Sequence, residues 1–107
     1  MAWVYLGVAG LLEIVWASAM KHSDGFTKLW PTIICLVGMV ASVVLLSISM
    51  KTLPLGTAYS VWTGIGAAGA FVFGIVVLGE AASMGRILAA VLIVSGLVLM
   101  KLSSDSA

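Results

Sequence analysis

The sequence predicts an all-α integral membrane protein with four transmembrane helices in each chain. Hydrophobic residues make up 63% of its 107 residues, and charged residues make up 8%. Soluble globular domains contain about a quarter charged residues, so this composition places the chain in lipid. Four apolar stretches are also long enough to cross a hydrocarbon core of about 30 Å as helices.

The four predicted helices cover residues 2–20, 31–50, 57–78 and 84–101. A helix rises about 1.5 Å per residue, so roughly 20 residues cross the bilayer core. The first stretch contains an acid and lacks a basic leader, and we therefore expect a mature spanning helix rather than a signal peptide. Residues 1–107 are expected to form a single transmembrane domain, with a tail at 103–107 that enters water.

Charged and turn-forming residues separate the predicted helices. The connections are residues 21–25, 51–56 and 79–86. They are short, so successive helices are expected to be neighbours. Pro31 is placed in the first turn of the second helix, where a missing N–H is tolerated. Trp3 and Trp30 suit the aromatic belt at the membrane interface.

Composition also disfavours several classes of function. The formal net charge of +1, without a basic cluster, gives no support for nucleic-acid binding. Cys35 has no second cysteine with which to form an intrachain disulfide, and no Cys/His spacing resembles a metal site. We therefore expect neither a metal nor a cofactor. An enzyme is disfavoured because the acid in the spans has no second catalytic group at its depth.

The basic residues give little preference for one orientation in the membrane. Lys51 and Lys101 are predicted on the side of both termini, and Lys21, Lys28 and Arg86 on the other. Orientation follows the Lys/Arg imbalance across short loops, and a difference of one is too small to set it. We expect insertion in both orientations. The alternative is a single orientation with the first and third loops in the cytoplasm.

Glu13 is the one acidic residue within the predicted spans. A charge near the bilayer centre costs on the order of 3 kcal/mol, and such residues face a bundle interior or a water-filled cavity. Gly10, Ala17 and Trp16 share its helical face, so another helix or a ligand can approach closely. Protons and a cation compete for such a carboxylate, which is the chemistry of an antiporter. The alternative is a permanently protonated acid that bonds a neighbouring helix.

Other polar and aromatic residues are predicted at similar depth. Ser42 lies near the middle of the second span, within reach of a hydrogen bond to Glu13. Tyr59, Trp62 and Thr63 fall on one face of the third helix. Aromatic faces attract cations, so these residues form a candidate wall for a cation site. Packing or interfacial anchoring is the alternative interpretation of the aromatic residues.

Small residues have two possible roles in the third and fourth helices. Gly64, Gly66 and Gly69 are expected to interrupt the third helix, either for tight packing or as a hinge. We hypothesise a hinge that is used for alternating access. The fourth helix contains Gly85 and Gly96 but no buried charge, and is interpreted as an assembly surface.

Several motifs together resemble the small multidrug resistance transporters. They are Gly10-Leu-Leu-Glu13-Ile-Val-Trp16, Gly25-Phe26-Thr27-Lys28-Leu29-Trp30-Pro31, Leu53-Pro54-Leu55-Gly56-Thr57-Ala58-Tyr59 and Trp62-Thr63-Gly64-Ile65-Gly66. The resemblance covers the whole chain. Trp16, Thr57, the Thr63–Gly66 run and Lys101 are similar to the guanidinium-exporter subtype.

The resemblance implies an antiparallel, dual-topology homodimer in the bacterial inner membrane that exchanges protons for guanidinium. The residues that match the family's binding positions are Glu13, Trp16, Ser42, Tyr59 and Trp62. Two alternatives remain open. In the first, the same fold exports lipophilic quaternary ammonium cations instead. In the second, the chain is a non-transporting membrane subunit or regulator that uses Glu13 to pair with another protein.

Overall fold

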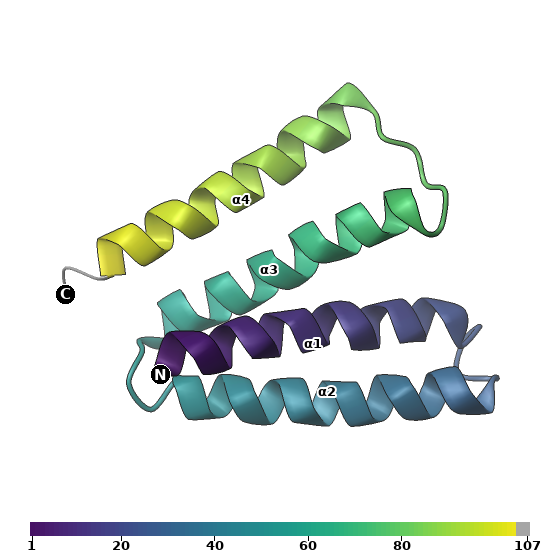
Figure 1. Cartoon of the computed structure of the whole chain (residues 1–107), viewed down its shortest axis with the longest axis horizontal. Helices are drawn as coiled ribbons and strands as arrows, with labels where there is room; N and C mark the ends of the chain where they lie inside the picture. Colours follow the sequence, from purple (N-terminus) through teal and green to yellow (C-terminus); the bar gives the residue numbers. More distant parts are fainter. Residues whose placement is uncertain (105–107) are drawn as a thin grey trace.

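The computed structural model describes residues 1–104 and is shown in Figure 1. This described part contains four α-helices and no strand. The helices are α1 (Ala2–His22), α2 (Leu29–Ser49), α3 (Leu55–Val76) and α4 (Met84–Ser104). Each is long and apolar enough to cross a membrane. The predicted all-α architecture with four transmembrane helices is confirmed for this part of the chain.

The helix ends differ from the predicted ends for local reasons. α1 continues to His22, where the Ser23 hydroxyl donates to the Met20 carbonyl and ends the helix. α3 begins directly after Pro54, whose extended backbone lets its carbonyl accept the first helical bond from Ala58. α4 continues to Ser104, so the first two residues of the predicted tail are helical, and their entry into water stays a prediction. Residues 105–107 of that tail lie outside the described residues.

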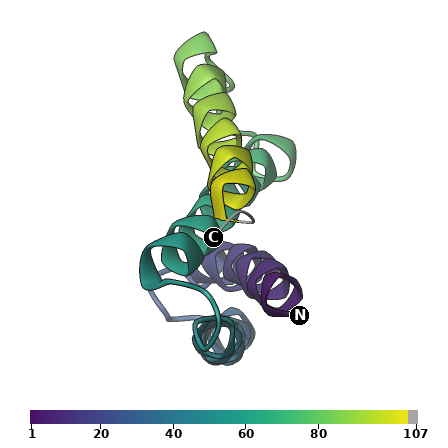
Figure 2. The same ribbon diagram turned by 90° about the vertical axis from the view of Figure 1, so that its left-hand side faces the viewer.

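The described helices form a thin layer with α1 near its middle. α1 packs against α2 and α3, whereas α4 packs against α3 and lies apart from the other two (Figures 1 and 2). The principal extents are 44 × 34 × 16 Å. α4 contributes no buried residue to the described structure. The fourth helix therefore has most of its surface available to lipid or to another chain.

A small apolar cluster holds α1, α2 and α3 together. Its buried members are Leu6, Ala9, Leu46, Ala58, Val61 and Trp62. Large apolar side chains are exposed along all of the described helices. A soluble protein would bury such surface, whereas lipid tails solvate it without cost. The small core and apolar exterior agree with a chain that folds in a bilayer.

The two ends of the layer carry different connections. Residues 23–28 and 77–83 lie at one end, and the N-terminus and the last turn of α4 lie with residues 50–54 at the other (Figure 1). The first connection turns through positive φ angles at Asp24, Gly25 and Phe26. The Ser23 hydroxyl supports this turn by accepting from the Phe26 N–H at 3.0 Å. Lys21, Lys28 and Arg86 therefore lie near one end of the layer, and Lys51 and Lys101 lie near the other, as the sequence predicted.

Candidate functional site

Glu13 lies in the contact between α1 and α3. A Cβ atom built on Gly66 would overlap the Glu13 carboxylate, so the missing side chain of Gly66 makes the space that the carboxylate occupies. Glu13 Oε1 is buried and has no hydrogen-bond partner among the described residues. Buried polar atoms in native proteins are almost always paired. This orphaned acceptor is therefore a candidate binding atom.

Glycines allow close approach along this seam, as the sequence predicted for a packed acid. A Cβ on Gly10 would lie 2.7 Å from the Ile65 side chain, and one on Gly69 would overlap Ile14. Contacts below 3.0 Å force a shift of the neighbouring atoms. Gly10, Gly66 and Gly69 thus bring α1 and α3 close together on both sides of Glu13.

Gly64, Gly66 and Gly69 do not interrupt α3, which is a continuous α-helix from Leu55 to Val76. The expectation of an interruption is wrong, because each glycine is placed where a neighbouring side chain fills the space of its missing Cβ. Gly64, for example, faces Leu97 of α4. Packing therefore explains these glycines in the described conformation, and their use as a hinge stays a prediction.

Trp16 presents a second unpaired atom on the Glu13 face of α1. Its indole Nε1 is buried and has no partner among residues 1–104. α2 packs closely against the base of this side chain, because a Cβ atom built on Gly38 would lie 3.1 Å from Trp16 Cβ. An indole N–H donates only. The site thus contains an unpaired acceptor on Glu13 and an unpaired donor on Trp16.

Ser42 does not make the expected hydrogen bond to Glu13. Its buried hydroxyl donates to the Ala9 carbonyl at 2.6 Å and accepts from Trp62 Nε1 at 2.9 Å. A serine hydroxyl has one proton, so donation to Ala9 excludes donation to Glu13. Ala9 lies one helical turn before Glu13. Ser42 therefore connects α1, α2 and α3 next to the acid.

The two aromatic residues of the predicted wall, Tyr59 and Trp62, pack against each other on α3. Trp62 is buried, and Tyr59 packs on it with ring centroids 5.6 Å apart and planes inclined by 50°. Tyr59 itself is 54% exposed, so its phenol is accessible from outside the single chain. Their contact with a cation stays a prediction.

Thr63 and Gly64 lie on the side of α3 that faces α4, where Tyr59 lines the same cavity. Thr63 is exposed and lines a cavity of about 370 Å³ with Tyr59, Gly64 and Ile93. This cavity lies between α3 and α4, whereas Glu13 lies between α3 and α1. The structure therefore joins Ser42 and Trp62 to α1 one turn before Glu13, packs Trp16 against α2, and places Thr63 toward the gap beside α4.

Two polar interactions in the described structure were not anticipated from the sequence. The Ala9 carbonyl is the acceptor that connects α1 to Ser42, and a backbone atom leaves no signal in a residue pattern. The pairing of Glu80 with Arg86 was also missed. Opposite charges six positions apart in a connecting segment are a weak signal, because the backbone path of that segment decides whether they meet.

These features define a multi-pass membrane protein with an acid between two spanning helices, one oxygen of which is buried and unpaired among the described residues. The sequence profile of the family described as Small Multidrug Resistance protein matches residues 1–93. The chain therefore belongs to the small multidrug resistance family, as the motifs around Glu13 and Trp62 predicted.

Relatives in this family share most of the length of the chain. A protein of Yersinia pseudotuberculosis named guanidinium exporter is 58% identical over 104 residues, which cover 97% of this chain and 100% of that protein. Proteins with the same name from Citrobacter freundii and Salmonella typhimurium are 54% and 55% identical, and each match covers 97% of this chain and 99% of that protein. These relatives are bacterial.

Proposed function

We propose that this protein exports guanidinium from the cytoplasm in exchange for protons, with Glu13 as the group for which the two cations compete. The observation that carries the proposal is the buried, unpaired Oε1 of Glu13 inside a transmembrane helix. Ionisable groups at that depth are costly and mark ion pathways. The names of the relatives support guanidinium as the transported cation.

The chemistry of guanidinium suits the unpaired oxygen of Glu13. The ion is planar, permanently charged at neutral pH, and presents forked N–H donors that match a carboxylate in two parallel bonds. Deprotonated Glu13 supplies the acceptor oxygens. Tyr59 and Trp62 supply aromatic faces on α3 that attract a cation. A cation without N–H donors would leave the carboxylate incompletely paired, which should weaken its binding.

The proposed functional unit is an antiparallel homodimer in the bacterial inner membrane. A single chain is 16 Å thick and leaves Glu13 partly exposed, so it cannot enclose the acid by itself. A second copy would cover Glu13 and the open side of α4. The nearly even division of basic residues between the two ends supports insertion in both orientations, which an antiparallel pair requires.

In the proposed dimer two carboxylates share one site, and this sharing determines how many protons one guanidinium can displace. In a dimer both Glu13 side chains would face one cation, so their titrations would be coupled. Binding of one guanidinium would then displace up to two protons, and export would move net positive charge inward. At that ratio a membrane potential of 100 mV adds about 2.3 kcal/mol per cycle to the driving force.

Guanidinium-evoked current from the purified protein in liposomes tests the proposal. We expect current with guanidinium, a much smaller current with tetraethylammonium, and loss of both with Glu13→Gln. Asp24→Asn is the matched control, because Asp24 lies in the exposed first connection and Asn tolerates its positive φ angle. The control should retain its current.

The alternatives predict different results in the same assay. Larger current with tetraethylammonium than with guanidinium would favour an exporter of quaternary ammonium cations. Absence of current with either cation, from protein that is correctly folded, would favour a subunit or regulator. Such a protein should also be isolated with a stoichiometric partner.

A further inference from the structure

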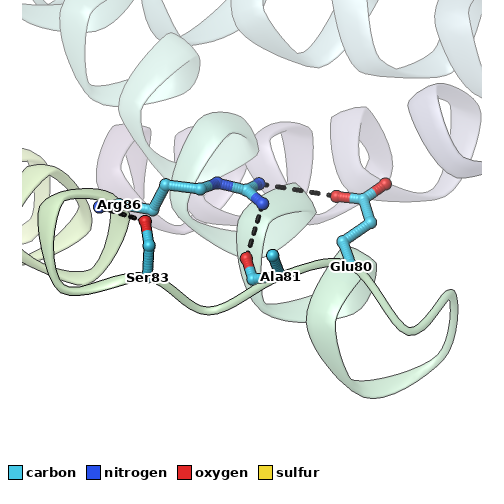
Figure 3. A network of polar contacts seen from close by, with 4 residues as sticks. All are labelled: Glu80, Ala81, Ser83 and Arg86. Atoms are coloured by element: carbon cyan, nitrogen blue, oxygen red, sulfur yellow. Dashed lines mark hydrogen bonds and ion pairs between the residues drawn. The ribbon is translucent and has the colours of Figure 1, made fainter.

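The structure shows how this chain binds a guanidinium group of its own, the side chain of Arg86. Its Nη2 lies 3.5 Å from Glu80 Oε1, and its Nη1 donates to the Ala81 carbonyl at 2.5 Å (Figure 3). The guanidinium carbon lies 5.1 Å from the centre of the Phe71 ring. A carboxylate, a carbonyl and an aromatic face together recognise this group.

The acceptors are held in place by the backbone rather than by Arg86. The connection after α3 turns back at Gly79, where φ is +70°, and the Glu80 N–H donates to the Gly74 carbonyl at 2.9 Å. A Cβ on Gly74 would overlap the Glu80 carboxylate, so the glycine makes space for it against α3. Because Glu80 is fixed in this way, its carboxylate should remain available when Arg86 moves away.

A cavity of about 320 Å³ lies beside the Glu80–Arg86 pair. Its lining includes the charged residues Glu80, Arg86 and Lys21 and the small residues Ala17 and Ala67. Ala17 lies one helical turn after Glu13, and Ala67 follows Gly66, against which the Glu13 carboxylate packs. The Glu80 carboxylate thus shares a cavity with residues of α1 and α3 that lie close to Glu13 and Gly66 in the sequence.

We propose that Glu80 forms a second, peripheral guanidinium site, and that Arg86 occupies this site as a tethered competitor of the substrate. The substrate class rests on the proposed function. Free guanidinium presents the same forked donors as the Arg86 side chain, so the same carboxylate, carbonyl and ring suit both. The Arg86 side chain is 43% exposed and can move into water when it is displaced.

The tether determines when the substrate occupies this site. A group attached through a short flexible linker competes at an effective concentration on the order of millimolar or above. Guanidinium should therefore displace Arg86 only when it accumulates. Lys21 places a second positive charge on the cavity, which opposes entry of further cations while Arg86 remains paired.

Equilibrium dialysis with labelled guanidinium tests the site in a Glu13→Gln background, in which the central site is disabled. Addition of Arg86→Ala should create binding of about one guanidinium per protomer at saturation, because the competitor is removed. Further addition of Glu80→Gln should abolish it. Lys21→Ala is the matched control: it removes the same charge from the cavity but leaves Glu80 paired with Arg86, and should create little binding.

Two results would overturn the proposal: equal binding in the Arg86→Ala and Lys21→Ala proteins, or binding that persists without Glu80. Arg86→Lys, which keeps the charge but lacks the fork, should give intermediate binding and replaces Arg86→Ala if that protein does not fold. Wild-type flux in liposomes is measured separately. Absence of wild-type flux together with Glu80-dependent binding would reject only the proposed export. Wild-type flux without Glu80-dependent binding would reject only the peripheral site.

Discussion

Glu13 and Gly66 act together at the scale of single residues. The carboxylate fills the space that any larger residue at position 66 would take, and one of its oxygens remains unpaired there. Binding sites depend on such placement to within about 0.5 Å. Gly66 is therefore interpreted as the residue that sets the position of the carboxylate.

Gly66→Ala should displace the Glu13 side chain and weaken guanidinium binding by on the order of tenfold or more, because the added methyl group occupies the carboxylate position. Titration of the purified protein with guanidinium measures the affinity. Gly56→Ala is the control on the same helix, since nothing lies within 4 Å of its added Cβ. Equal affinities for the two variants would contradict the assigned role of Gly66.

Sequence reasoning located Glu13 but not its surroundings. An acid in an apolar span stands out by its transfer cost alone, so its importance was predictable. Its contact with Gly66 depends on the rotation and depth of α3 relative to α1, which hydropathy does not determine. The same limit explains why Ser42 was expected to bond Glu13, whereas its proton is used by the Ala9 carbonyl.

Ser42 joins three elements. Its hydroxyl receives the Trp62 indole N–H of α3 and donates to the backbone of α1, from a buried position on α2. This connection fixes the buried ring of Trp62 relative to the turn that precedes Glu13. Interhelical hydrogen bonds in membranes average about 0.6 kcal/mol, whereas an indole left unpaired costs about 1–3 kcal/mol.

Ser42→Ala should lower the free energy of unfolding in detergent by about 1 kcal/mol, because it removes two hydrogen bonds and leaves the Trp62 N–H unpaired. Ser49→Ala is the control, because Ser49 is equally buried on α2 but bonds the Leu46 carbonyl of its own helix. Unfolding is followed by tryptophan fluorescence. A loss in Ser49→Ala as large as that in Ser42→Ala would contradict the connecting role.

The elements themselves were largely predictable, because spans of about 20 apolar residues have few alternatives in lipid. The helix ends differ from the predicted ends where capping interactions determine the boundary, as at Ser23 and Pro54. The separation of α4 from α1 and α2 was not predictable. Its small residues are compatible with packing inside one chain or between two chains, and composition does not distinguish these cases.

The whole molecule is a thin apolar layer with similar basic charge at both ends. If the charge balance permits both orientations, a label on the C-terminus of the wild type should be accessible from both sides of the membrane. Ala82→Lys adds a basic residue to an exposed position of the third connection and makes the count four against two. This variant should place more of its C-termini outside the cytoplasm. Labelling from one side alone in the wild type would contradict dual topology.

In the proposed dimer, protonation of Glu13 should limit the affinity for guanidinium. If guanidinium and protons compete for Glu13, the apparent affinity for guanidinium falls as pH falls, since protonated carboxylates cannot pair with the cation. Binding measured across a range of pH should show this decrease in the wild type. An affinity for guanidinium that is independent of pH would contradict direct competition.

The central claim is that one carboxylate exchanges protons for guanidinium, and proton release on binding tests it most directly. Guanidinium added to weakly buffered, purified protein should release protons in proportion to binding, and Glu13→Gln should release none. The Asp24→Asn control should behave as the wild type. Guanidinium binding without proton release, or release that persists in Glu13→Gln, would contradict the assignment of Glu13 as the shared site.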